Sequence, residues 1–131
     1  MVDAEKNSLS SSIKIKVKPA YLEEHSEPEL AKYVFAYTVN ICNEGLEPVQ
    51  LLSRHWIITD GNNAVREVTG EGVVGEQPHI APGKCYQYSS GAVLSTKIGT
   101  MEGSYQMISS SGEIFDAAIE PFGLVHPRSL Q

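Results

Sequence analysis

The stretch Tyr33–Cys42 carries large side chains at its odd positions and smaller or polar ones at its even positions. A period of two indicates a β-strand with one buried face, because successive side chains of a strand point to opposite sides of the sheet. No segment of the chain shows the sustained period of about 3.6 residues that an amphipathic helix requires. This contrast predicts an all-β protein.

Further segments alternate in the same way, and clusters of Gly, Pro, Asn and Ser separate them. Three lysines alternate with apolar residues in the first of these segments, which favours an edge strand because lysines discourage pairing with another chain. Prolines and glutamates between 19 and 32 predict a solvated loop. Gly99 and Gly103 indicate a bend, a bulge or a close contact in a long strand. Strands are expected near 13–17, 33–42, 49–60, 64–69, 85–89, 99–107 and 115–119, with 92–97 unassigned.

Seven to eight short strands predict an immunoglobulin-like β-sandwich of two antiparallel sheets, with a β-barrel as the alternative. Leu52, Trp56 and Ile58 are expected on one face of their strand, with Arg54 between them. The tryptophan is expected to pack between the sheets, and most other aromatic side chains are also expected in the core. One domain is expected over 1–131, with 1–11 as a flexible tail.

The net charge of −6 comes without a cluster of basic residues, which argues against nucleic-acid binding. No apolar run approaches the roughly 20 residues that span a bilayer, so no membrane partner is expected. The N-terminal sequence lacks the pattern of a secretory signal, which predicts a cytoplasmic location. Cys42 and Cys85 allow a single disulfide, but without export they are expected to be free thiols.

Gly70, Gly72 and Gly75 match the spacing G-x-G-x-x-G of dinucleotide-binding folds. In those folds the motif opens a helix whose N-terminus holds the pyrophosphate. Here Pro78 and Pro82 follow closely and leave no room for a helix. The segment is therefore predicted to be a loop, and no nucleotide cofactor is expected.

A glycine-rich loop can still bind an anion, because successive backbone N–H groups can form a concave nest. The alternative is that the glycines have a structural role only, because they permit a turn with positive φ. In the anion hypothesis, nearby basic side chains supply positive charge. The candidate anion-binding residues are Gly70, Gly72, Val73, Gly75, Arg54, Arg66 and His79.

Catalytic and metal-binding patterns are missing from the sequence. The four histidines, His25, His55, His79 and His126, fall in no metal-ligand spacing, so no metal site is expected. No G-x-S-x-G motif is present, and Cys42 lies on the smaller-residue face of its strand. These observations predict a protein without enzymatic activity and without a cofactor.

Several blocks of the chain resemble, in the same order, the motifs of the ApaG family. They are Ser53-Arg54-His55-Trp56, residues 70–78, Pro82-Gly83, Tyr88-Ser89-Ser90-Gly91 and residues 101–107, followed by Phe122 and Leu124. The resemblance runs from about Ile13 to Leu124. It implies a fibronectin-type-III-like or immunoglobulin-like sandwich and supplies no catalytic residues. It also implies an association with cobalt tolerance and magnesium efflux. Related domains in eukaryotic F-box proteins and in a polymerase-delta-interacting protein look like interaction modules.

A non-enzymatic binding module with protein partners is therefore the leading hypothesis, as a monomer or a weak homo-oligomer and with a link to divalent-cation homeostasis. The alternative is a small-anion binder that uses residues 70–75 on phosphate or pyrophosphate. A third option is a hydrolase of phosphorylated compounds, which needs a nucleophile or a metal cluster beside that loop.

Overall fold

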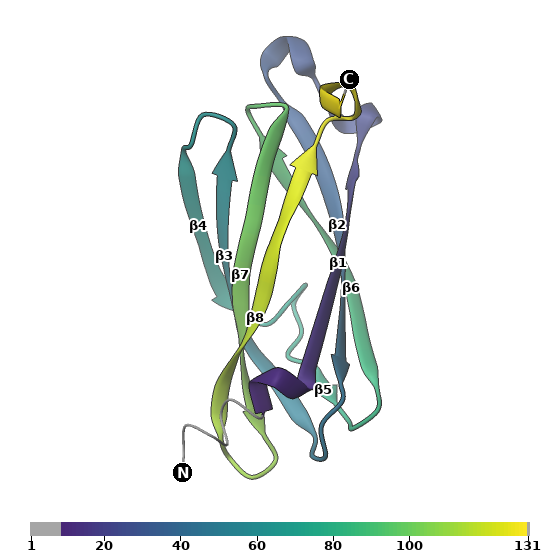
Figure 1. The fold of residues 1–131 in the computed structure, drawn as a ribbon, viewed down its shortest axis with the longest axis vertical. Coiled ribbons are helices and arrows are strands. Elements are labelled where there is room, and N and C mark those ends of the chain that lie inside the picture. The colour runs from purple at the N-terminus through teal and green to yellow at the C-terminus, as the bar shows by residue number, and fades with distance from the viewer. Residues whose placement is uncertain (1–8, 131) are drawn as a thin grey trace.

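The computed structural model describes residues 9–130, with the backbone alone at 129 and 130, and these residues form two stacked antiparallel sheets (Figure 1). The first sheet has the order β1-β2-β6. The second has the order β4-β3-β7-β8, and the short strand β5 pairs with the beginning of β3. The strands are β1 (Ile13–Tyr21), β2 (Tyr33–Asn43), β3 (Val49–Asp60), β4 (Val65–Glu71), β5 (His79–Ile80), β6 (Cys85–Leu94), β7 (Ile98–Ser109) and β8 (Ile114–Val125).

The core lies between the sheets, as the alternating pattern predicts. Every odd residue of β2 from Tyr33 to Asn43 is buried, and every even residue is only partly buried. Trp56 from β3 packs edge-on against Tyr37 of β2 and Tyr105 of β7. Strands β1 and β8 close one side of the sandwich, whereas β4 and β6 are the last strands of their sheets on the other side. The sandwich is confirmed, and the barrel is not formed.

Two strands of the first sheet, β1 and β6, are longer at their C-terminal ends than the sequence predicts. β1 continues through Pro19 to Tyr21, so the predicted loop over 19–32 begins too early. β1 is an edge strand, where the missing N–H of proline is tolerated. Similarly, β6 continues to Leu94 and includes part of the unassigned segment. Residues 9–12 form a helical turn with Leu9 against the core, and the rest of the predicted tail, 1–8, lies outside the described residues.

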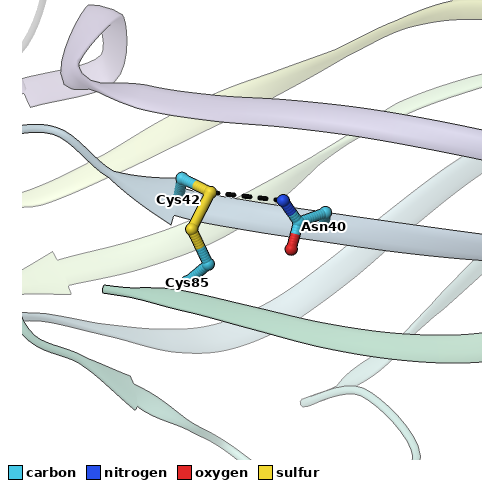
Figure 2. The surroundings of a disulfide bond; sticks show 3 residues. All are labelled: Asn40, Cys42 and Cys85. Carbon is cyan, nitrogen blue, oxygen red and sulfur yellow. Dashed lines mark hydrogen bonds between the residues drawn. A yellow bond between two sulfur atoms is a disulfide. The ribbon is translucent and has the colours of Figure 1, made fainter. Parts of the chain in front are cut away.

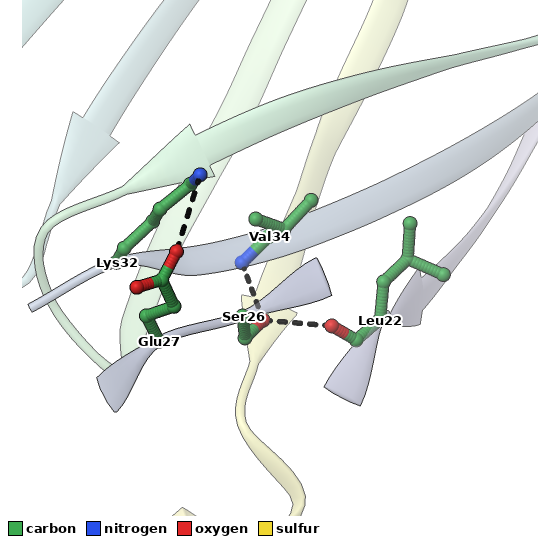
Figure 3. Close-up of polar contacts among 5 residues, drawn as sticks. All are labelled: Leu22, Ser26, Glu27, Lys32 and Val34. Atoms are coloured by element: carbon green, nitrogen blue, oxygen red, sulfur yellow. Dashed lines mark hydrogen bonds and ion pairs between the residues drawn. The ribbon is translucent and has the colours of Figure 1, made fainter. Parts of the chain in front are cut away.

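The connection from β1 to β2 holds two 3-10 turns, η1 (Glu23–His25) and η2 (Pro28–Leu30). Ser26 fixes this connection to the first sheet, as Figure 3 shows: its hydroxyl donates to the Leu22 carbonyl and accepts from the Val34 N–H. An exposed ion pair of 3.9 Å between Lys32 Nζ and Glu27 Oε1 spans the second turn.

Cys42 and Cys85 form a disulfide on the outer face of the first sheet (Figure 2), so the prediction of free thiols is wrong. The antiparallel register of β2 and β6 puts the two residues directly opposite each other, with their Cα atoms 4.0 Å apart. A separation of 43 residues along the chain gives no hint of this pairing. Asn40 Nδ2 donates to Cys42 Sγ at 3.3 Å.

Two β-bulges adjust the second sheet. One lies at Leu52 in β3, where the register with β7 shifts between Leu51 and Ser53. The other lies in β8 at Glu120-Pro121, where the register with β7 shifts between Met101 and Gly103. A Cβ on Gly103 would stand 1.9 Å from the His55 carbonyl oxygen, so the close contact predicted for β7 is present.

Candidate functional site

The bulge at Leu52 decides which side chains of β3 face the first sheet. Before it, Val49 and Leu51 are buried; after it, Trp56 and Ile58 are buried. The buried positions thus change from odd to even, so Leu51 lies in the core where Leu52 was predicted. Arg54 has the same parity as Trp56 and therefore lies on the inner side of the sheet. Bulges commonly re-aim side chains in this way.

The segment after β4 folds back as a small hairpin between the two sheets (Figure 1). The carbonyl of the bulged Leu52 anchors it, accepting the Gly72 N–H and the Gln77 Nε2, each at 2.9 Å. Val73 and Glu76 then exchange two backbone hydrogen bonds of 2.8 and 2.9 Å. The sequence prediction of a loop is right, and the next element is the short strand β5 rather than a helix.

The two residues at the tip of this hairpin, Val74 and Gly75, both have positive φ, 43° and 80°. Two-residue hairpins of the type I′ class need this geometry, which glycine and asparagine adopt easily and a β-branched residue resists. Among the described residues, the backbone N–H groups of Val74 and Gly75 have no hydrogen-bond partner. The tip therefore presents two adjacent free donors.

Arg54 lies against this hairpin. Its Nη1 donates to the carbonyl oxygens of Glu71 (3.0 Å) and Gly72 (2.9 Å). The guanidinium occupies the space beside Gly70, where an added Cβ would stand 2.7 Å from Cζ and from Nη2. Within residues 9–130, no carboxylate lies within ion-pair distance of Arg54, so its positive charge is not neutralised.

A cavity of about 190 Å³ opens between this hairpin and the inner face of β6. Arg54 is the charged residue in its wall, and neither an aspartate nor a glutamate lines it. The lining residues are Tyr37, Arg54, Trp56, Val73, Val74, Gly75, Tyr88 and Ser90.

Trp56 and Tyr37 bring two further donors to the cavity. The two residues are 2% and 5% exposed, and among the described residues neither the indole N–H nor the phenol O–H makes a hydrogen bond. Within residues 9–130, no polar side-chain atom is both inaccessible to solvent and without a hydrogen-bond partner. Each of these two groups is therefore open to solvent, and both residues line the cavity.

Tyr88 forms the wall of the cavity on the β6 side, and its hydroxyl is hydrogen-bonded to that of Tyr105 in the core. Burial raises the pKa of Tyr88 above its ordinary value of 10.0, and burial together with the neighbouring Tyr88 raises the pKa of Tyr105. Both groups therefore stay protonated and neutral at physiological pH. The wall of the cavity carries no negative charge from this pair.

The structure brings together five of the seven predicted anion-binding residues. Val73, Gly75 and Arg54 line the cavity, and Gly70 and Gly72 contact the Arg54 side chain. The N–H groups of Gly72 and Val73 are already bonded within the hairpin, so the nest expected from the glycine spacing is replaced by the free N–H groups of Val74 and Gly75.

Arg66 and His79 do not line this cavity. Arg66 lies further along β4 and its Nη2 donates to the Val93 carbonyl at 3.4 Å. His79 lies in β5, beside a different hollow. Within residues 9–130, no three His, Cys, Asp or Glu side chains come together as a metal site. In the same residues, no helix is both long and apolar enough to cross a membrane.

Five residues of the cavity were not among the predicted site residues: Tyr37, Trp56, Val74, Tyr88 and Ser90. Their alternation marks the aromatic ones as core, which they are. One chemical property of the aromatic residues could have pointed to a site: a buried tryptophan or tyrosine needs a hydrogen-bond partner for its N–H or O–H. The sequence does not identify such a partner.

Comparison with known proteins agrees with the motif resemblance. The family model described as "DUF525: ApaG domain" matches residues 23–109. A protein named ApaG from Pseudomonas aeruginosa is 56% identical over 118 residues, which cover 90% of this chain and 94% of that protein. One of the same name from Azotobacter vinelandii is 53% identical with the same coverage.

Solved structures show the same relationship. The crystal structure of a putative ApaA protein from Bordetella pertussis is 50% identical, with a TM-score of 0.86 over 88% of this chain and 94% of that one. A structural genomics target solved by X-ray crystallography is 52% identical, with a TM-score of 0.87 over 91% and 90% of the two chains. The family model and these relatives together show that the chain belongs to the ApaG family.

Proposed function

We propose that the protein is a non-enzymatic binding module that accepts one anionic group, a phosphate or a carboxylate, in the cavity between the hairpin tip and β6. The observation that carries the proposal is a pair of donors without a hydrogen-bond partner among the described residues, the Trp56 N–H and the Tyr37 O–H, on two buried residues that line one cavity. Neither donor is sealed from solvent, so a bound ligand can reach both. A ligand with acceptor oxygens would satisfy both.

The charge of the cavity supports an anion over a neutral acceptor. Arg54 uses Nη1 for the two hairpin carbonyls, and its Nη2 and Nε have no partner among the described residues. A guanidinium presents a planar fork of donors that matches carboxylate and phosphate oxygens. The free N–H groups of Val74 and Gly75 add two donors of the kind that form anion nests.

The size of the cavity limits the ligand to a single group. Sites for cofactors and drug-sized molecules enclose about 300–1,000 Å³, whereas this cavity measures about 190 Å³. A whole nucleotide is therefore not the proposed ligand. The remainder of whatever molecule carries the anion would stay outside the cavity, in contact with the surface around it.

Titration calorimetry with inorganic phosphate and with acetate tests this proposal. We expect saturable binding in the millimolar range, as befits a small ligand with few contacts, and a loss of at least about tenfold in affinity in Arg54→Gln. Arg66→Gln is the matched control, since this arginine lies on the inner side of the same sheet but outside the cavity. Equal affinity of wild type and Arg54→Gln, or no heat with either anion, contradicts the proposal.

A further inference from the structure

The gap between β4 and β6 extends well beyond the cavity. Register places Arg66 and Val68 of β4 opposite Ile58 and Trp56 of β3, so these residues share the inner side of the second sheet with Arg54. The inner side of β6 faces them. From the cavity outward, its residues are Tyr88, Ser90, Ala92 and Leu94. Figure 1 shows β6 crossing the molecule diagonally behind β1 and β2. The hydrogen bond from Arg66 to the Val93 carbonyl and the hollow shared by Ala64 and Leu94 place the end of β6 close to the start of β4.

A second hollow, of about 310 Å³, lies at that far end. Ile58 and Leu94 line it and are themselves buried, while Val65 and Val93 line it and are 61% and 45% exposed. Val65 and Val93 alternate with the gap-facing Arg66 and Leu94, so their exposed side chains lie on the outer faces of the two sheets. The apolar side chains that face the hollow are therefore those of Ile58 and Leu94.

Backbone groups along the gap are also available. β4 and β6 are the outermost strands of their sheets on this side, so each presents one edge without a neighbouring strand. Such edges bind extended peptides by strand addition. Arg66 reaches across the gap to the Val93 carbonyl with a long hydrogen bond of 3.4 Å, a weak contact that a bound chain can replace.

From these features we infer that the anionic group is carried by an extended polypeptide, which lies along the gap with its anionic residue in the cavity and an apolar residue in the second hollow. This inference rests on the anion site proposed above. The charge pattern supports it, because Arg54 and Arg66 both face the gap without an ion-pair partner among the described residues, in a chain of net charge −6.

The geometry sets the spacing between the two anchors. Arg54, the charged residue of the cavity, lies four residues from Ile58 of the second hollow on β3, and Ser90 lies four residues from Leu94 on β6. Four residues of extended chain cover about 13 Å, and residues i and i+4 of a strand point to the same side. An anionic residue and an apolar residue four positions apart would therefore both face the gap.

Two synthetic peptides test this spacing. The first has a central phosphoserine with valine four positions before and after it, so that either chain direction is acceptable. The second has the same composition with valine at three positions before and after, which points the valine away. A third, with glutamate in place of phosphoserine, distinguishes a phosphorylated from a carboxylate-bearing partner. Inorganic phosphate is titrated in parallel with all three.

We expect the first peptide to bind about tenfold more tightly than either inorganic phosphate or the second peptide, since it also buries a valine side chain. Ala64→Trp fills the second hollow and removes this tenfold difference without changing the affinity for phosphate. Asn62→Trp, on the same turn but outside the hollow, retains it.

Equal affinity of the two phosphopeptides, or no gain over phosphate, overturns this inference while leaving the anion site in place. Failure of phosphate itself to bind overturns the anion site and this inference together. A glutamate peptide that equals the phosphopeptide assigns the partner as an acidic segment rather than a phosphorylated one, within the same inference.

Discussion

Gly70 has no side chain at the point where the Arg54 guanidinium packs against β4. A Cβ there would overlap the guanidinium, which is the flexible end of a side chain and can move away at little cost. We therefore expect Gly70→Ala to change the free energy of unfolding by less than about 1 kcal/mol and to weaken phosphate binding markedly. Calorimetry and urea unfolding of the same preparation measure the two effects.

Gly123→Ala is the matched control for that substitution. Gly123 also lies in a strand of the second sheet, and a Cβ there meets only ordinary van der Waals contact with Val125. It is expected to leave both stability and phosphate affinity close to wild type. If Gly70→Ala binds phosphate as the control does, Arg54 does not need its present position to bind the anion.

Val74 holds a conformation that its side chain opposes. A positive φ costs a non-glycine residue about 1–2 kcal/mol, and the exposed Val74 has φ 43°. We expect Val74→Gly to raise the free energy of unfolding by about 0.5–1 kcal/mol, less than the full strain because glycine gains entropy in the unfolded chain. Thermal unfolding measures the effect. Val74→Ala keeps a Cβ, so it should raise the free energy of unfolding by less than Val74→Gly does. A larger increase in Val74→Ala than in Val74→Gly would contradict the idea that Val74 is strained.

The Tyr88–Tyr105 pair predicts a loss of stability at alkaline pH. Burial raises both pKa values in the folded state above the value of 10.0 expected for the unfolded chain. The contribution to stability is therefore full below pH 10, and it falls above pH 10 because the unfolded chain releases its protons first. Each tyrosine adds a slope of up to about 1.4 kcal/mol per pH unit.

Urea unfolding across this pH range measures that slope. Tyr105→Phe is expected to be less stable at neutral pH, because it loses the hydroxyl contact with Tyr88, but to lose stability less steeply above pH 10. Parallel curves for the variant and the wild type would show that the pair does not govern alkaline unfolding.

Among the elements, the alternating pattern of side chains predicts the strands well, but it predicts the bulges and connections less well. β3 was predicted with its observed bounds, Val49–Asp60, because turn residues flank it on both sides. The bulge at Leu52 was not predicted, since an extra residue leaves a strand's composition unchanged. The bulge places Leu51 rather than Leu52 in the core, while Arg54 stays on the inner side of the sheet with Trp56. The Leu52 carbonyl holds the hairpin.

The disulfide joins β2 to β6 and closes a loop of the chain that contains β3, β4 and the hairpin. A cross-link that closes a loop of 43 residues is expected to stabilise the fold by about 4 kcal/mol through the entropy of the unfolded chain. Replacing both cysteines by serine should lower the free energy of urea unfolding by roughly that amount. Reductant should have the same effect on the wild type and none on the double variant; an unchanged wild-type midpoint under reductant would contradict the estimate.

For the whole molecule, the sandwich could be predicted because a buried face repeats every second residue, whichever strand pairs with which. The site could be predicted only in part. The glycine spacing and Arg54 identified the region, but the donors of Trp56 and Tyr37 belong to residues that the pattern correctly assigns to the core. Whether a core residue turns its polar end to a cavity depends on packing between strands far apart in the sequence, and no local pattern records it.

The indole N–H of Trp56 offers the most direct measurement, because the chain has a single tryptophan and this group gives one isolated NMR signal. On titration with inorganic phosphate, we predict that this signal and the amide signals of Val74 and Gly75 shift together and saturate along one binding curve. Shifts of surface amides alone, with the indole signal unmoved at millimolar phosphate, would contradict the anion site.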